Sequence, residues 1–294
     1  MSDTSGAQSE ITIACIQMEP IVGAKQANLA KSLEFIGQAA LNGARLIVLP
    51  ELANSGYVFR DRAEAFALAE EVPAGETTAA WIDAARRHDV YIVAGIAERA
   101  GTTLYNSAVV LGPSGYIGTF RKMHLWAAEN LFFEPGDLGF PVFKTQIGRI
   151  GVAICYDRHY PEYMRALAVA GADLVVVPQA GAVGEWPDGL YEAEMRVAAF
   201  QNGYYTALCN RVGEEECLTF AGESFVCSPE GDVIALAPAL QDVILYADLD
   251  LASAAKSHAR RLFLRDRRPE LYAAWIGSTA QESVSHDSAT KAPR

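Results

Sequence analysis

A pattern that occurs twice in this chain of 294 residues limits what the chain can fold into. Residues 43–51 read GARLIVLPE, and residues 171–179 read GADLVVVPQ. Each copy follows an expected helix and consists of Gly-Ala, an apolar run, a proline and a polar residue. A short apolar run bounded by glycine and proline is typical of a buried strand. The two copies therefore predict two halves of strands and helices that pack against each other.

The order of the other predicted elements indicates a mixed α/β fold. Several strands are joined as hairpins, for example by the turn sequence GPSG at 112–115, and this favours two sheets with helices outside. We expect strands at 11–16, 46–49, 90–96, 107–111, 116–120, 150–154, 174–177, 204–209, 224–227, 233–236 and 243–247, and helices at 26–41, 77–88, from 161 onward and at 190–201.

No linker rich in Gly, Pro or Ser divides the middle of the chain, so we expect one domain over residues 10–278. Residues 1–9 are polar and predict a flexible N-terminus. Residues 279–294 carry few large apolar groups and predict a disordered tail.

The composition excludes several classes of protein. A net charge of −12 argues against nucleic acid or an anionic membrane as partner. No apolar run reaches the length of a membrane span, and the polar N-terminus lacks the basic and apolar parts of a signal peptide. Five cysteines without close pairing favour reduced thiols over a disulfide framework, and Cys217 is expected in a loop. These features predict a cytoplasmic protein.

Cys155 lies in GVAICYDRHYPEYMRAL, where a predicted strand ends and the chain turns towards a helix. At such a turn a side chain is held out of the sheet while backbone N–H groups point at whatever it attacks. The alternative for an isolated cysteine is a small core hydrophobe.

Two further stretches carry chemistry. Glu51 follows Pro50 at the end of an apolar strand, where a lone glutamate is otherwise a helix cap or a surface charge. Lys122 lies in FRKMHLW, directly after a predicted strand and among aromatic and apolar residues. Burying its amino group without a partner is costly, and the alternative is a solvated lysine.

The three blocks LPE, RKMHL and GVAICYD, in this order, resemble the catalytic motifs of the nitrilase (carbon–nitrogen hydrolase) superfamily. The resemblance extends from ITIACIQ at residue 11 to RDRRPELY at residue 265. It implies a four-layer α-β-β-α sandwich, a Glu51–Lys122–Cys155 triad, and no metal or organic cofactor. It also implies a homodimer or higher homo-oligomer through helices near the cysteine, at residues 160–170.

The resemblance also implies a reaction sequence. Glu51 takes the proton of Cys155, and the thiolate attacks the carbon of an amide or carbamoyl group. Lys122 favours the thiolate and stabilises the oxyanion, and the backbone N–H of Tyr156 is a second donor. Ammonia leaves, and water activated by Glu51 hydrolyses the thioester.

Many relatives carry a second glutamate beside the lysine, and AAENLFFEPGD contains two candidates. Glu129 lies six residues before Pro-Gly, as in relatives, and is preferred for orienting Lys122 and the substrate. Glu134 lies directly before Pro135 and is interpreted as a turn residue. The alternative for Glu129 is a solvated loop charge.

Histidines provide the main rival mechanism. His159 lies four residues after Cys155, so a Cys–His dyad is an alternative. His124 lies near Lys122 and either lines the pocket or caps a strand. A metal site is not indicated, because the chain has no CxxC or HExxH motif and its histidines are scattered.

Candidate substrate-binding residues flank the catalytic blocks. Arg158 or His159 would hold a substrate carboxylate, as in hydrolases of N-carbamoyl amino acids. Arg158 alternatively has a structural role, paired with Asp157, with Glu162 or with a neighbouring subunit. The full set of candidates is Tyr57, Trp126, Tyr156, Arg158 and His159.

The sequence Cys-Tyr-Asp at 155–157 differs from the Cys-Trp-Glu common in relatives that act on nitriles. We therefore expect a hydrolase that releases ammonia from a small linear amide or N-carbamoyl compound. One alternative is a nitrilase. The other is a catalytically silent relative that acts as a binding protein, against which the intact set of Glu51, Lys122 and Cys155 argues.

Overall fold

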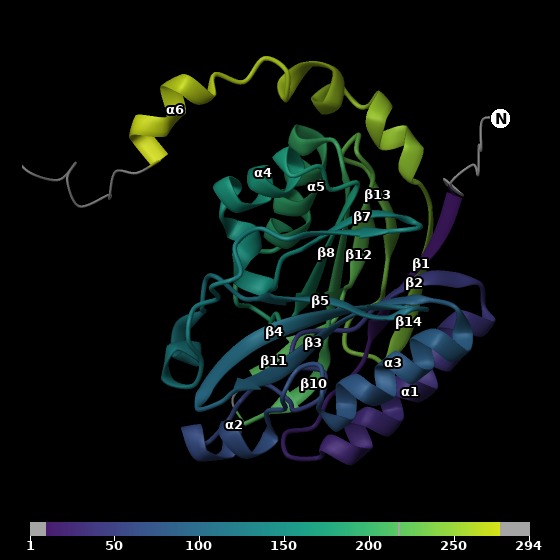
Figure 1. The fold of residues 1–294 in the computed structure, drawn as a ribbon, viewed down its shortest axis with the longest axis vertical. Coiled ribbons are helices and arrows are strands. Elements are labelled where there is room, and N and C mark those ends of the chain that lie inside the picture. Colours follow the sequence, from purple (N-terminus) through teal and green to yellow (C-terminus); the bar gives the residue numbers. More distant parts are fainter. Residues whose placement is uncertain (1–9, 217, 277–294) are drawn as a thin grey trace, which may run out of the picture.

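Two six-stranded sheets pack face to face between layers of helices in the computed structural model, which describes residues 10–216 and 218–276 (Figure 1). The first sheet has the order β14-β1-β2-β3-β4-β5, and the second has the order β13-β12-β9-β8-β7-β6. The four-layer α-β-β-α architecture expected from the sequence is confirmed. The strands of the first sheet are β1 (Glu10–Gln17), β2 (Ala44–Val48), β3 (Tyr91–Ala100), β4 (Thr103–Gly112), β5 (Gly115–Arg121) and β14 (Val243–Asp250). Those of the second are β6 (Val142–Thr145), β7 (Gly148–Val152), β8 (Leu174–Gln179), β9 (Tyr205–Asn210), β12 (Phe225–Cys227) and β13 (Val233–Leu236).

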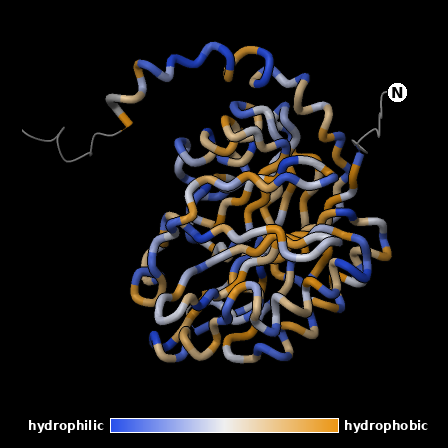
Figure 2. The backbone as a smooth tube through the Cα atoms, in the orientation of Figure 1, coloured by the Kyte–Doolittle hydropathy of each residue, from blue (hydrophilic) through white to orange (hydrophobic). Residues whose placement is uncertain are grey.

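Helices cover the outer face of each sheet. Helices α1 (Lys25–Leu41) and α3 (Glu76–His88) lie against the first sheet, where Ile36 and Trp81 are buried together with strand residues such as Ile47. Helices α4 (Pro161–Val169) and α5 (Leu190–Asn202) lie together beside the second sheet (Figure 1). Apolar segments gather in the strands between these layers, and hydrophilic ones follow the periphery (Figure 2). Burial of these apolar side chains is the main favourable contribution to folding.

The two copies of the repeated pattern form equivalent strands, β2 and β8. Strand β2 pairs in parallel with β1 and β3, and β8 pairs in parallel with β7 and β9. Both strands are therefore central in their sheets, and their carboxyl ends carry Glu51 and Gln179 respectively. Crevices at the carboxyl ends of parallel strands are common ligand sites, so this end of the molecule is the place to look for chemistry.

Several elements were missing from the sequence prediction. They are α2 (Arg62–Leu68), β6, the hairpin of β10 (Val212–Glu215) and β11 (Leu218–Ala221), and α6 (Pro269–Ile276). The predicted strand 150–154 is also too long, because β7 ends at Val152 and a short 3₁₀ helix, η2 (Cys155–His159), separates it from α4. Further short helices are η1 (Ala127–Leu131), η3 (Leu251–Lys256) and η4 (Ala259–Phe263). Figure 1 shows η3, η4 and α6 following one another as an arm beyond α4 and α5.

The predicted flexible N-terminus (1–9), the disordered tail (279–294) and the loop position of Cys217 lie outside the described residues, and the single domain over 10–278 stays a prediction. Within residues 10–216 and 218–276, no helix combines the length and the apolar character needed to cross a membrane.

Candidate active site

Cys155 is held in a constrained turn at the end of the strand β7. Its φ angle is +47°, in the left-handed region that residues other than glycine rarely adopt. Such backbone strain persists where the surroundings determine it, and it is concentrated at functional sites. The surroundings here include Asp157, whose carboxylate accepts the N–H of Ile154 at 3.0 Å and the N–H of His124 at 3.0 Å. This carboxylate joins the cysteine turn to the loop that follows Lys122.

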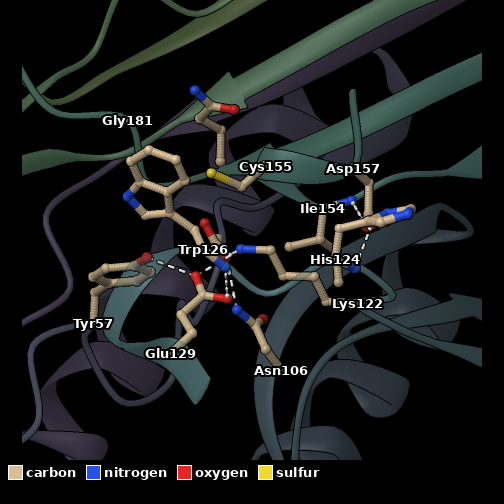
Figure 3. A network of polar contacts seen from close by, with 12 residues as sticks. Tyr57, Asn106, Lys122, His124, Trp126, Glu129, Ile154, Cys155, Asp157 and Gly181 are labelled. Atoms are coloured by element: carbon tan, nitrogen blue, oxygen red, sulfur yellow. Dashed lines mark hydrogen bonds and ion pairs between the residues drawn. The ribbon is translucent and has the colours of Figure 1, made fainter. Parts of the chain in front are cut away.

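Lys122 follows β5 directly, and its side chain is fully buried. Its amino group donates to Oε1 of Glu51 at 2.8 Å and to Oε1 of Glu129 at 2.6 Å. Figure 3 shows this amino group between Glu129 and the sulfur of Cys155. A buried ammonium group is tolerated only where it is paired and hydrogen-bonded, and two carboxylates meet that condition here.

Glu51 is fully buried, and its two oxygens differ in their surroundings. Oε1 accepts from Lys122 and from Nδ2 of Asn106 at 2.7 Å. Oε2 has no hydrogen-bond donor among the described residues. A buried carboxylate oxygen without a donor is costly, so this atom is a free acceptor of the site.

Glu129 is the second glutamate beside the lysine. It is 5% exposed, and its Oε1 accepts both from Lys122 and from the hydroxyl of Tyr57 at 2.6 Å. Its Oε2 accepts the N–H of Trp126 at 3.2 Å. Glu134 has an exposed side chain whose nearest charged partner is Arg62, at 3.9 Å. The geometry thus separates the two candidates and favours Glu129.

Burial dominates the electrostatics of the site. Burial raises the pKa of the Cys155 thiol, Glu51 adds to this, and Lys122 and Arg158 oppose it without reversing it. Burial alone would lower the pKa of Lys122, but Glu129 and Glu51 outweigh it and keep the amino group charged. Burial also raises the pKa of Glu129, against the opposing effect of Lys122. Lys122 thus favours the thiolate, as expected from the sequence, but burial and Glu51 outweigh its effect on the pKa of Cys155 at rest.

Aromatic side chains form a wall beside the thiol. The ring of Trp126 lies 4.8 Å from that of Tyr156 and 5.3 Å from that of Trp186. The ring of Trp186 in turn lies 5.0 Å from that of His159. The predicted residues Trp126, Tyr156 and His159 are therefore brought together, and Trp186 joins them from the segment after β8.

Arg158 is buried, and its side chain contacts protein groups. Its Nη1 donates to the carbonyl of Cys155 and to Oε1 of Gln179, each at 2.9 Å. Its Nε lies 3.3 Å from Glu194 on α5. Neither Asp157 nor Glu162 is its partner among the described ion pairs. Binding of a substrate carboxylate by Arg158 remains a prediction that this arrangement does not favour.

The two histidines near the candidate site, His159 and His124, each have a carboxylate partner. Nδ1 of His159 pairs with Glu194 at 2.5 Å, and Nδ1 of His124 pairs with Asp157 at 2.8 Å while its ring stacks on Tyr160. No hydrogen bond joins His159 to Cys155 in the part of the chain that is described, so the geometry does not support the Cys–His dyad. Over the same residues, no group of three or more His, Cys, Asp or Glu side chains is arranged to hold a metal ion.

Sequence reasoning missed several polar residues of the site. Asn106 lies in the middle of β4, and Asp157 was considered only as a partner of Arg158 and as part of the Cys-Tyr-Asp sequence. Gln179 occupies the position equivalent to Glu51 in the repeated pattern, so the repeat itself was the signal for it. The others, Glu185, Trp186 and Tyr191, lie in a segment that carries no recognised motif.

The site thus combines a buried cysteine, a paired lysine and two glutamates at strand ends of an α-β-β-α sandwich, which is the arrangement expected for a carbon–nitrogen hydrolase. Comparison with known proteins agrees: the model of the carbon–nitrogen hydrolase family matches residues 12–259. The chain belongs to the carbon–nitrogen hydrolase family.

Individual relatives show how far the similarity extends. The chain is 42% identical over 264 residues to a protein named nitrilase from Pyrococcus abyssi, covering 89% of this chain and 99% of the relative. It is 32% identical to N-carbamoylputrescine amidase from Solanum lycopersicum, covering 89% and 93% respectively. The structure of a carbon–nitrogen hydrolase from Helicobacter pylori is similar with a TM-score of 0.84 and 30% identity, covering 92% of this chain and all of that one. These relatives place the chain in the nitrilase superfamily.

Proposed function

We propose that this carbon–nitrogen hydrolase cleaves a small linear amide or N-carbamoyl compound and releases ammonia through a thioester at Cys155. The observation that carries the proposal is the fully buried Lys122, paired with Glu51 and Glu129 beside the thiol. An ammonium group that two buried carboxylates keep charged beside the thiol is suited to stabilise a developing oxyanion.

In the first step the proton of the Cys155 thiol moves to Glu51, and the sulfur forms a bond to the substrate carbon. The free Oε2 of Glu51 is the acceptor that suits this transfer. A thiol whose pKa is raised by burial needs such a base. Lys122 and the N–H of Tyr156, in the first turn of η2, donate to the oxyanion.

In the second step the C–N bond breaks, and Glu51 returns its proton to the departing ammonia. Glu51 then takes a proton from water, and the water oxygen forms a bond to the thioester carbon. The C–S bond breaks, and Glu51 returns this proton to the sulfur of Cys155. Glu129 orients Lys122 throughout, and Tyr57 holds Glu129. These are positioning roles, because neither residue reacts with the substrate in this sequence.

We further propose a homodimer in the cytoplasm. Helices α4 and α5 expose the apolar side chains of Val169, Val197 and Phe200, which favours an interface at this layer. The tomato relative named as an N-carbamoylputrescine amidase supports a carbamoyl substrate, and the archaeal relative named as a nitrilase supports nitriles as the second candidate.

The test is ammonia release from a panel of primary amides, N-carbamoyl amino acids, alkyl ureas and nitriles, with Cys155→Ala protein as the blank. We expect turnover of an amide or carbamoyl compound by the wild type only, and a mass increase on Cys155 during turnover that matches the acyl group. Turnover by the Cys155→Ala variant would overturn the thioester mechanism. A preference for nitriles would instead identify the protein as a nitrilase. Absence of turnover, together with a Cys155 thiol that forms no acyl adduct, would indicate a binding protein.

A further inference from the structure

The segment after β8 forms part of the wall of the active site. Trp186 from this segment contacts the aromatic side chains beside Cys155. Tyr191, at the start of α5, lies under the guanidinium group of Arg158, with 4.3 Å between Cζ and the ring centroid. Because Arg158 also donates to the carbonyl of Cys155, this segment is connected to the nucleophile through a short chain of contacts.

Glu185 is the half-buried acid of this wall. Its Oε2 accepts from the hydroxyl of Tyr191 at 2.6 Å and from the N–H of Ala182 at 3.2 Å. Its negative charge also contributes to raising the pKa of Cys155, which places the carboxylate within electrostatic range of the thiol. No cation pairs with Glu185, and no donor reaches its Oε1, among the described residues.

Arg158, the arginine that contacts this wall, is covered by protein groups, and its Nε and Nη2 have no hydrogen-bond acceptor among the described residues. The side chain of Arg158 is 1% exposed, has Glu194 as its carboxylate partner and is covered by the ring of Tyr191. A ligand carboxylate would have to displace that ring to reach the guanidinium group. Residues 180–194 contain four acidic and no basic residues. Two of these acids have arginine partners, Arg196 for Glu192 and Arg158 for Glu194, whereas Glu185 and Asp188 have no cationic partner among the described residues.

A buried donor lies beside this acid. Gln179 is fully buried, its Oε1 accepts from Arg158, and its Nε2 has no acceptor among the described residues. Gly181 keeps the space next to it open, because a Cβ there would lie 2.5 Å from Nε2 and 2.8 Å from the hydroxyl oxygen of Tyr191. A buried N–H without an acceptor is costly. The wall thus has two free groups. Nε2 of Gln179 can donate to a ligand oxygen, and Oε1 of Glu185 can accept from a positively charged donor.

We infer that Glu185 is a specificity-determining residue that selects substrates with an ammonium group at the end remote from the scissile amide. The amide or carbamoyl oxygen satisfies the donors of the site, and the ammonium group binds Oε1 of Glu185. The indole rings of Trp126 and Trp186 add a surface that attracts cations. The inference rests on the proposed function, because it assigns a substrate class to the same site.

The experiment compares three primary amides of similar length at pH 7: 5-aminopentanamide, which is cationic, pentanamide, which is neutral, and glutaric acid monoamide, which is anionic. For the wild type we expect kcat/KM to fall in that order. In Glu185→Gln, the ratio of the cationic to the neutral amide should fall about tenfold, mainly through KM, because one charge-assisted hydrogen bond is lost. Glutamine retains an oxygen for Tyr191 and Ala182, so the fold should persist, as circular dichroism would show.

The matched control is Asp188→Asn, which removes an exposed negative charge three residues away. We expect it to leave the ratio unchanged. A preference for the anionic amide, an unchanged ratio in Glu185→Gln, or an equal fall in Asp188→Asn would overturn the assignment to Glu185.

Binding separates this inference from the proposed reaction. Calorimetric titration of the three amides into Cys155→Ala protein, with and without Glu185→Gln, measures the subsite without turnover. Failure of the wild type to hydrolyse any of the amides would count against the reaction for this substrate class. Equal binding of the cationic and anionic amides to the Cys155→Ala protein would overturn the subsite whatever the reaction.

Discussion

The strands β2 and β8 end in the same way but carry different chemistry. Each copy of the pattern ends with proline followed by a polar residue, and both polar residues, Glu51 and Gln179, are fully buried. At the first end a carboxylate accepts from Lys122 and keeps Oε2 as a free acceptor. At the second end an amide accepts from Arg158 and keeps Nε2 as a free donor. Equivalent backbone positions thus provide hydrogen-bonding groups of opposite character.

The difference explains how a repeated architecture produces a site with distinct roles. A carboxylate can take and return a proton during a reaction, whereas a side-chain amide cannot serve as such a base. Gln179 instead shares Nη1 of Arg158 with the carbonyl of Cys155 and so supports the segment that holds the nucleophile. One strand end is suited to proton transfer and the other to positioning.

Glu51→Gln should have the largest effect, because it makes the two strand ends chemically alike. The amide still accepts from Lys122 but cannot take the thiol proton, so we expect kcat to fall about 10³-fold. Steady-state ammonia release measures this effect. Glu134→Gln, which removes an exposed carboxylate, is the control and should retain activity. Activity of Glu51→Gln within tenfold of the wild type would remove Glu51 as the base.

Gln179→Glu makes the reverse change and should have an intermediate effect. A further buried carboxylate near the nucleophile should raise the pKa of Cys155. We therefore expect slower alkylation of Cys155 by iodoacetamide and a fall in kcat/KM of about 10 to 100-fold. Mass spectrometry of the labelled cysteine measures the rate, with Gln179→Met as a neutral comparison. Unchanged labelling in Gln179→Glu would mean that the second strand end does not act on the thiol.

Tyr57→Phe should have the smallest effect on kcat/KM. The change affects only the group of Glu51, Lys122 and Glu129, at the end of β2. The hydroxyl of Tyr57 donates to the ionised form of Glu129 and so lowers its pKa, against the burial that raises it. Removing the donor raises the pKa of Glu129. On the acidic side, kcat/KM of Tyr57→Phe should then fall at a pH up to about one unit higher than in the wild type. At the pH where kcat/KM is maximal, the variant should be at most about tenfold less active than the wild type.

The pH dependence of kcat/KM for the wild type and for Tyr57→Phe tests this expectation. Tyr116→Phe, which changes an exposed tyrosine of β5, provides the matched control. A shift of the acidic limb towards lower pH would contradict the assigned hydrogen bond.

The sequence predicted the parts of this molecule that are encoded locally. The apolar runs of β2 and β8, their prolines and the three motif blocks were sufficient for the fold and for the residues that gather around Lys122. Strand β6 and the hairpin β10–β11 were missed because runs of four residues show no clear period. The wall formed by Glu185 and Tyr191 was missed because it depends on contacts that cross the fold, such as Arg158 with Glu194. The pairing of Arg158 with Glu194 was not expected from the sequence, because the two residues are 36 positions apart in the chain.

The burial of Cys155 has a consequence for damage by oxidants. Peroxides react with thiolates much faster than with thiols, and a pKa raised by burial keeps this sulfur protonated at rest. The resting protein should therefore survive peroxide concentrations that inactivate enzymes with a permanent thiolate. Sensitivity should appear only while a substrate draws the proton away, so oxidative inactivation would depend on turnover.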